Sequence, residues 1–279
     1  MRDLSDIAGL PLLLDPEEMH FAFGKEARDP LYGTRLADQM RLVLLDRDCQ
    51  LPEIIYWMMR DTGLKDRSYL KDSHDLRYDI SIFRHEHFGR EFMKTSGHYH
   101  PLPKGSDIAW PEVYEIIDGQ ALYVLQKVND INLGPDEVEV EDVIILEANP
   151  RDKAIMPPNY GHVTINTLTV PMVMSNWVSS QFSSVYGKVE EAVGFAYYYL
   201  HGDGSPRWVK NPKYTKPLPP LRRAVVREVP ELGLTRAKPL VLSALDDPSR
   251  FDWLNNPAGN MELIWQGLEI VGEVEVGEL

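Results

Sequence analysis

The hydrophobic pattern changes twice along the chain and is most regular in the middle. From residue 51 to about residue 182, short apolar and β-branched runs are separated by turn signals such as Asp118-Gly119 and Leu133-Gly134-Pro135-Asp136. Many short strands at close spacing predict an antiparallel sandwich or barrel, and the lack of strand–helix alternation argues against a Rossmann or TIM architecture. The predicted strands are EIIYWMM, RYDISIF, EFMKTSGHYH, EVYEIID, ALYVLQKV, VEVEDVIIL and PMVMSNWVSSQF.

The N-terminal 50 residues carry helix signals. Asp15-Pro16-Glu17-Glu18 has proline and carboxylates where a first helical turn favours them, so we expect a helix to begin here. Apolar residues from Thr34 to Leu45 recur at helical spacing and predict a second helix.

The C-terminal third is mixed. We expect two short helices, an extended Pro- and Lys/Arg-rich connector, and a strand within the last 20 residues. The helices are predicted at 185–196 and 246–255, and the connector at 206–223.

Composition narrows the possible partners. The net charge is −14, which disfavours binding to nucleic acid or to anionic membranes. The one cysteine, Cys49, allows no disulfide within the chain and no thiolate cluster. The N-terminal apolar run is short and has acidic neighbours, unlike a signal peptide, and no run is long enough to span a bilayer. We therefore expect a cytoplasmic protein.

Four residues form a candidate metal site. His98 and His100 stand two positions apart, so in a strand both imidazoles share one face. Glu112 begins the EVYEIIDG strand, and His162 lies where the strand after PPNYG begins. Three imidazoles and one carboxylate are a ligand set for a divalent transition metal.

Each part of this site also has an ordinary interpretation. A lone HxH is more often incidental, and His85-Glu86-His87 repeats the pattern at a place that we expect to be surface or rim. His162 alone would be a half-buried histidine, and Glu112 alone a solvated charge, with Glu115 as a weaker rival ligand. The order of the four residues supports the metal site.

That order resembles the two motifs of the cupin superfamily. The first motif is matched by Gly97, His98, His100, Glu112 and Gly119, and the second by Pro158, Gly161, His162 and Asn166. The chain departs from the usual pattern because eleven residues, PLPKGSDIAWP, separate His100 from Glu112 in place of three or four. We expect this insertion to be a loop at the barrel mouth.

The match is closer to the cupin-type (archaeal-type) glucose-6-phosphate isomerases. KTSGHYH, PEVYEIIDGQALYVLQ, PPNYGHVTIN, VYGKVE and NPKY carry this resemblance over roughly residues 50–212. It implies metal binding by His98, His100, Glu112 and His162, and substrate binding by Ser81, Thr95, Gly97 and Tyr114. It also implies catalytic roles for Glu112 and Tyr186. Ser81 stands where a threonine is expected.

The resemblance implies a mainly β protein with a single cupin (double-stranded β-helix or jelly-roll) barrel at 51–215. An N-terminal helical segment at 1–50 would pack on the barrel. The extension at 216–279, with Trp253 and Trp265, has no family counterpart and could cover a sheet edge.

The implied activity is a metal-dependent aldose–ketose isomerase that interconverts glucose 6-phosphate and fructose 6-phosphate by an enediol or a hydride shift. Iron is the expected metal, with Mn²⁺, Ni²⁺, Co²⁺ or Zn²⁺ also possible, in a homodimer. Lys94 and Arg90 are expected to offset the negative charge near a bound phosphate. The alternatives are an Fe(II) cupin dioxygenase, an isomerase or epimerase of another sugar, and a non-catalytic sugar-binding cupin.

Overall fold

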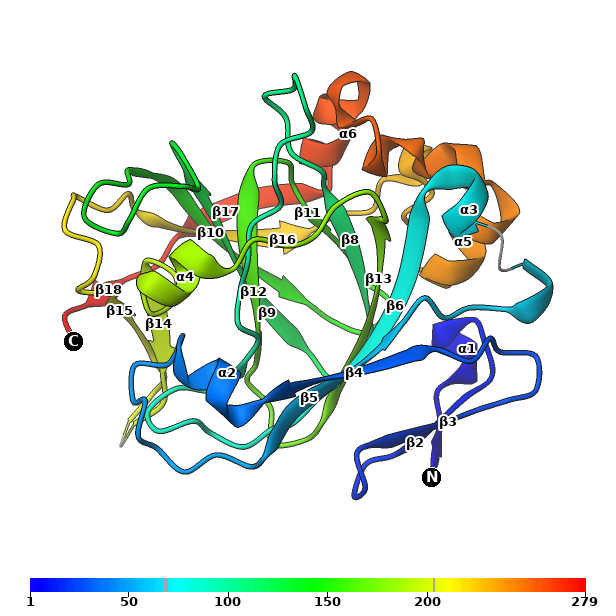
Figure 1. Cartoon of the computed structure of the whole chain (residues 1–279), viewed down its shortest axis with the longest axis horizontal. Helices are drawn as coiled ribbons and strands as arrows, with labels where there is room; N and C mark the ends of the chain where they lie inside the picture. Colours follow the sequence, from blue (N-terminus) through cyan, green and yellow to red (C-terminus); the bar gives the residue numbers. More distant parts are fainter. Residues whose placement is uncertain (68–69, 203) are drawn as a thin grey trace.

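Two six-stranded sheets form the centre of the computed structural model, which describes residues 1–67, 70–202 and 204–279 (Figure 1). Sheet I has the strand order β11-β8-β13-β6-β5-β4, with antiparallel neighbours throughout. Its strands are β4 (Leu31–Leu36), β5 (Ile54–Arg60), β6 (Leu76–Phe83), β8 (Glu112–Asp118), β11 (Lys153–Met156) and β13 (Met172–Ser179).

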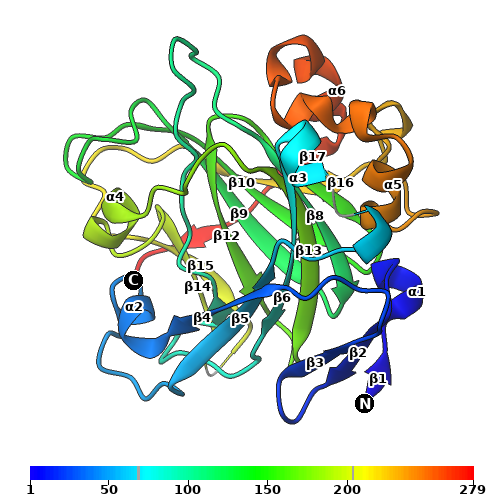
Figure 2. The same ribbon diagram turned by 45° about the vertical axis from the view of Figure 1, so that its right-hand side comes forward.

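Sheet II has the strand order β17-β16-β10-β9-β12-β7, and only its β10–β16 pair is parallel. Its strands are β7 (Met93–Lys94), β9 (Ala121–Val128), β10 (Val140–Ala148), β12 (Tyr160–Asn166), β16 (Leu221–Val226) and β17 (Leu268–Glu273). The two sheets face each other across the middle of the molecule (Figure 2). This two-sheet, mainly β arrangement confirms the predicted cupin fold, with no strand shared between the two sheets in the described residues.

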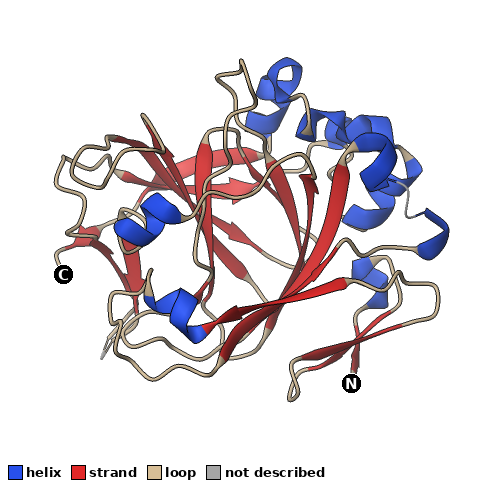
Figure 3. Ribbon diagram, in the orientation of Figure 1, coloured by secondary structure: helices blue, strands red, loops and turns tan. Residues whose placement is uncertain are grey.

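Strands β6, β8, β11 and β13 of sheet I are almost entirely buried, whereas the edge strand β4 is exposed or half-buried. All eight residues of β13 are buried, because one face looks into the molecule and helices cover the other. On the covered face, the ring of Trp177 packs 5.0 Å from that of Tyr78, and its indole N–H donates to the Leu240 carbonyl at 3.2 Å. Helices α3 (Leu70–His74), α5 (Leu240–Asp246) and α6 (Met261–Gln266) gather at this side (Figure 3).

The prediction that a helix begins at Asp15-Pro16 is wrong. Residues 16–19 instead connect β2 (Leu12–Asp15) to β3 (His20–Phe23) in an antiparallel hairpin. The Asp15 carboxylate accepts hydrogen bonds from the backbone N–H groups of Glu17 and Glu18, so the capping signal closes a turn. The strand β1 (Arg2–Asp3) and the four-residue helix α1 (Ser5–Ala8) complete this unit.

The helix expected from Thr34 to Leu45 is much shorter. Strand β4 continues to Leu36 because its backbone pairs with β5, and only α2 (Ala37–Arg41) is helical. Tertiary pairing has overridden the local helical periodicity. One consequence is that Arg35 lies directly opposite Tyr56 in the sheet.

The predictions for the C-terminal third are mostly confirmed. Helix α4 (Gly187–Glu191) falls in the first predicted helical range, and the 3-10 helix at Pro248–Leu254 falls in the second. The predicted connector includes β15 (Arg207–Lys210), which pairs with β14 (Tyr197–Leu200) and β18 (Val276–Gly277). Further short 3-10 helices lie at Lys65–Arg67, Pro230–Leu232 and Pro257–Asn260.

The residues after 216 extend sheet II. Strand β16 adds to β10, and β17 adds to β16, so the extension covers what would otherwise be the β10 edge. The two tryptophans of the extension lie in different surroundings. Trp253 is buried, and Trp265 packs edge-on against Tyr160 of β12. None of the helices built from described residues is long and apolar enough to cross a membrane.

Candidate metal centre

A cavity of about 310 Å³ lies between the two sheets. Strands β4, β5, β6, β8 and β13 supply much of its wall. Every site residue predicted from the sequence lines it, namely Ser81, Thr95, Gly97, His98, His100, Glu112, Tyr114, His162 and Tyr186.

Backbone pairing places His98 directly beside His162. Each residue donates its N–H to the carbonyl of the other, at 3.1 and 3.0 Å, although His98 lies outside the regular strands. Gly97 precedes it with φ +72°, a left-handed conformation that glycine adopts without a steric penalty. Gly161 is required for another reason, since a Cβ there would lie 2.6 Å from the Tyr99 ring. The glycines of the two motifs thus permit the pairing of the two histidines.

Glu112 reaches the site because it is the first residue of β8. The register with β13 sets it opposite Val178, on the cavity-facing side. The eleven-residue insertion leaves and returns as a loop, as predicted. It is held where the Ala109 N–H donates to the Asn159 side-chain oxygen at 2.7 Å.

The same loop orients the second imidazole. The Nδ1 of His100 lies 2.8 Å from the Trp110 carbonyl oxygen, which only accepts hydrogen bonds. Nδ1 therefore carries the proton, and Nε2 presents its lone pair to the cavity. The Trp110 ring stacks on Phe182 at 5.0 Å, which fixes the carbonyl that orients His100.

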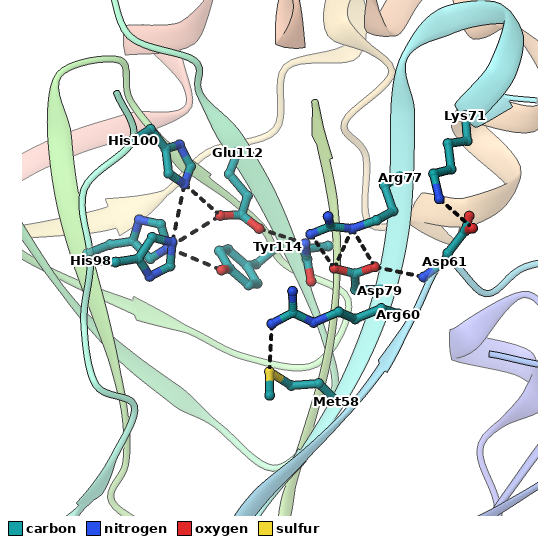
Figure 4. A network of polar contacts seen from close by, with 12 residues as sticks. Met58, Arg60, Asp61, Lys71, Arg77, Asp79, His98, His100, Glu112 and Tyr114 are labelled. Atoms are coloured by element: carbon teal, nitrogen blue, oxygen red, sulfur yellow. Dashed lines mark hydrogen bonds and ion pairs between the residues drawn. The ribbon is translucent and has the colours of Figure 1, made fainter. Parts of the chain in front are cut away.

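The four side chains converge on one point (Figure 4). The Nε2 of His100 lies 3.3 Å from the Nε2 of His98 and 3.4 Å from the Oε2 of Glu112, while the Nε2 of His162 lies 3.3 Å from the same oxygen. Ligand atoms bound to one metal at the usual 2.0–2.1 Å stand about 3.0–3.4 Å apart. These three separations match that spacing, and all four ligand atoms lie within 4.8 Å of one another, so the set could hold a divalent metal.

Electrostatics also suits a cation. Burial lowers the pKa of His98 well below its ordinary value, and the nearby rings of His162 and His100 lower it further. Burial likewise lowers the pKa of His162, against the opposing effect of Glu112. Burial alone would raise the pKa of Glu112, but the contacts with His100 and His162 hold it below its ordinary value. Neutral imidazoles around an ionised carboxylate are the forms that bind metals.

Two further residues contact the ligands. Asn176 of β13 donates to the Oε1 of Glu112 at 2.6 Å, leaving Oε2 for the converging nitrogens. The Tyr114 hydroxyl lies 3.1 Å from the Nε2 of His162, and burial raises the pKa of Tyr114 well above its ordinary value, so this hydroxyl stays protonated. The tilted ring of Tyr186 lies 5.3 Å from that of His98.

Glu115 is excluded as a metal ligand, and Lys94 and Arg90 are excluded as cations of the cavity. Glu115 is fully buried away from the cavity, where it pairs with Lys153 at 2.7 Å and accepts the Leu240 N–H. Lys94 is buried in an ion pair with Glu91, and Arg90 pairs with Asp46, so neither lines the cavity, and their predicted role is wrong.

The second HxH segment is also outside the cavity, as expected. His87 is exposed and stacks on His201 with ring centres 3.7 Å apart. His85 does not line the cavity either.

Sequence reasoning missed several polar residues of the cavity wall. They are Arg35, Arg60, Arg77, Asp79 and Asn176. Arg77 pairs with Asp79 at 2.9 Å, whereas Arg60 contacts the sulfur of Met58 at 3.3 Å. A signal was present, because Arg77, Asp79 and Ser81 occupy every second position of RYDISIF and so share one strand face.

Three glucose-6-phosphate isomerases of Thermococcus species are similar in sequence to about half of this chain. A glucose-6-phosphate isomerase of Thermococcus kodakarensis is 26% identical over 140 residues, which cover 50% of this chain and 65% of the relative. That of Thermococcus litoralis is 28% identical over 140 residues, with the same coverage, and that of Thermococcus gammatolerans is 27% identical over 141. The chain thus spans just under two thirds of the relatives that it matches.

Solved structures give weaker similarities. An oxalate oxidase in complex with glycolate matches with a TM-score of 0.30 and 12% identity, over 40% of this chain and 46% of that chain. A vicilin from Solanum melongena matches with a TM-score of 0.33 and 13% identity, over 51% and 34%. These values are too low to support a functional comparison. The family model for glucose-6-phosphate isomerase (GPI), in contrast, matches residues 36–216, more than half of the chain, which therefore belongs to the glucose-6-phosphate isomerase family.

Proposed function

We propose that the chain is a metal-dependent aldose–ketose isomerase that interconverts glucose 6-phosphate and fructose 6-phosphate. The observation that carries this proposal is the convergence of three imidazoles and one carboxylate in a cavity that also presents hydroxyl groups. Membership of the isomerase family supports the choice of substrate.

The ligands in this proposal are His98, His100, Glu112 and His162. When bound, the metal would act as a Lewis acid that stabilises negative charge on the C1 and C2 oxygens of the sugar. Iron is the proposed metal because the family resemblance implies it, whereas nitrogen and oxygen donors suit Mn²⁺, Co²⁺, Ni²⁺ and Zn²⁺ equally.

Glu112 is the proposed base of an enediol route. Its Oε1 is held by Asn176 and its Oε2 faces the imidazoles, so the carboxylate has a fixed orientation at the reacting end of the cavity. A carboxylate held in this way can carry a proton between C1 and C2. In a hydride-shift route the same carboxylate would serve only as a ligand.

The remaining residues are proposed to bind the sugar phosphate. Tyr114 and Tyr186 contact the histidines and are placed to hydrogen-bond sugar oxygens, with Tyr186 as the second catalytic residue. Ser81, Thr95 and Gly97 are proposed phosphate contacts on the same cavity wall. The homodimer and the cytoplasmic location remain predictions.

The test is conversion of glucose 6-phosphate by protein stripped with a chelator and reloaded with Fe²⁺, Mn²⁺ or Zn²⁺. Activity should disappear with the chelator, return with metal, and be lost in His162→Ala. His87→Ala is the matched control, because His87 lies outside the cavity and should not affect activity.

Folded, metal-loaded protein that converts none of the sugar phosphate with any of these metals would refute the proposal. Oxygen uptake by the Fe²⁺ form would then favour the dioxygenase alternative.

A further inference from the structure

Arg35 places a positive charge in the cavity wall without a carboxylate partner in the described part of the chain. Its Nε donates to the Tyr56 hydroxyl at 3.0 Å, and its guanidinium lies over the Tyr186 ring, 5.1 Å from the ring centre. The strand register and these contacts fix its position. Arg35 also forms a side-chain hydrogen bond with Tyr186. Because a guanidinium carries five N–H donors, these two tyrosine contacts leave donors available for a further acceptor in the cavity.

This arrangement differs from that of Arg77 in the same wall, which pairs with Asp79. A guanidinium that is partly withdrawn from water and has no anion beside it loses hydration without compensation. In a chain with a net charge of −14, acidic partners are abundant. The site around Arg35 is therefore suited to an anion that arrives from outside the chain.

The groups around Arg35 are hydrogen-bond donors. The Tyr56 hydroxyl accepts from Arg35 and is also hydrogen-bonded to Ser96, so it holds the guanidinium in place. The Thr95 hydroxyl accepts from the Thr164 N–H at 3.0 Å, so its proton is free. With Ser81 in the same wall, these donors match an anion that has several acceptor oxygens.

The distance to the metal centre matches a hexose phosphate. Arg35 lies 5.1 Å from the Tyr186 ring centre, and Tyr186 lies 5.3 Å from the His98 ring centre. At most the sum of these distances separates the guanidinium from the His98 ring. In an extended hexose 6-phosphate, four carbon–carbon bonds of about 1.5 Å each, plus the ester oxygen, separate C2 from phosphorus.

We propose that Arg35, held by Tyr56, is a specificity-determining residue that recognises the phosphate group of the substrate, with Ser81 and Thr95 completing the phosphate site. This inference rests on the proposed function for the identity of the substrate. The phosphate is bound equally in the ground state and in the transition state, so its recognition contributes to affinity.

The test compares Arg35→Met and Arg35→Lys with Arg60→Met. Arg60 is the matched control, because it lines the same cavity and its guanidinium contacts the Met58 sulfur. In Arg35→Met, KM for glucose 6-phosphate should rise about 10- to 100-fold, as expected for lost charge-assisted hydrogen bonds, with kcat nearly unchanged. Arg35→Lys should retain part of the affinity. An equal rise in Arg60→Met, or a fall in kcat alone, would overturn the inference.

A second measurement separates this inference from the proposed function. Titration of metal-loaded protein with inorganic phosphate, followed by calorimetry, should show binding to the wild type that is weakened at least tenfold in Arg35→Met. If the wild type converts no sugar phosphate, the proposed function fails, and this titration alone decides the role of Arg35. Equal binding by both proteins, or none by the wild type, would refute it.

Discussion

Asn176 donates a 2.6 Å hydrogen bond to Glu112 from the neighbouring strand, and both side chains are buried. This bond holds one carboxylate oxygen, and the other oxygen faces His100 and His162. Outer contacts of this kind commonly orient metal ligands. Asn176 therefore sets how Glu112 is presented to a metal.

Replacing Asn176 by alanine should weaken metal binding about 10- to 100-fold, because the carboxylate loses its orienting donor. Competition with a chromophoric chelator measures this. Ser175→Ala is the control, since Ser175 is the adjacent buried residue and does not line the cavity. Identical metal affinities for the two variants would show that Asn176 has no orienting role.

The stack of Trp110 on Phe182 gives a second prediction. Phe182→Ala should loosen the insertion loop and, through the Trp110 carbonyl, the orientation of His100, which lowers metal affinity about tenfold. Leu102→Ala changes an exposed residue of the same loop and should have no effect. The comparison uses the same chelator assay, and an unchanged affinity in Phe182→Ala would contradict the proposed orienting contact.

The buried pair of Glu115 and Lys153 gives a prediction on stability. Glu115→Gln removes one charge and leaves the other buried, which should cost about 3–5 kcal/mol in the free energy of unfolding. The double variant Glu115→Leu, Lys153→Met should be less destabilised than Glu115→Gln, as urea unfolding would show. Metal content should not change in either variant, because Glu115 lies away from the cavity.

Tyr214 gives a prediction for alkaline pH. Burial raises its pKa from 10.0 to about 12, despite the opposing hydrogen bond from Gln126. The folded state therefore holds this proton more tightly than the unfolded chain. The resulting stabilisation is complete below pH 10 and is lost as the pH rises towards 12. Between pH 9 and 12, the free energy of unfolding measured with urea should decline less steeply in Tyr214→Phe than in the wild type. Parallel declines in the two proteins would contradict this role of Tyr214.

The sequence predicted the β-rich middle of the chain and the four candidate ligands, since strand periodicity and motif order are local signals. It failed at Asp15-Pro16 and at Thr34–Leu45, where pairing with neighbouring strands overrides helical signals. Arg35 and Asn176 were missed for a related reason. Their place in the cavity depends on the register of strands that are distant in the sequence.

The position of Glu112 has a consequence for recognising such sites in other chains. Its carboxylate is placed by the pairing of β8 with β13, so the number of residues between it and His100 does not decide whether Glu112 reaches the cavity. Insertions of different length at this point are therefore compatible with the same position of Glu112, provided that the end of the loop still supplies the carbonyl that orients His100. A search that requires fixed spacing in this motif would overlook chains whose ligands are equally well arranged.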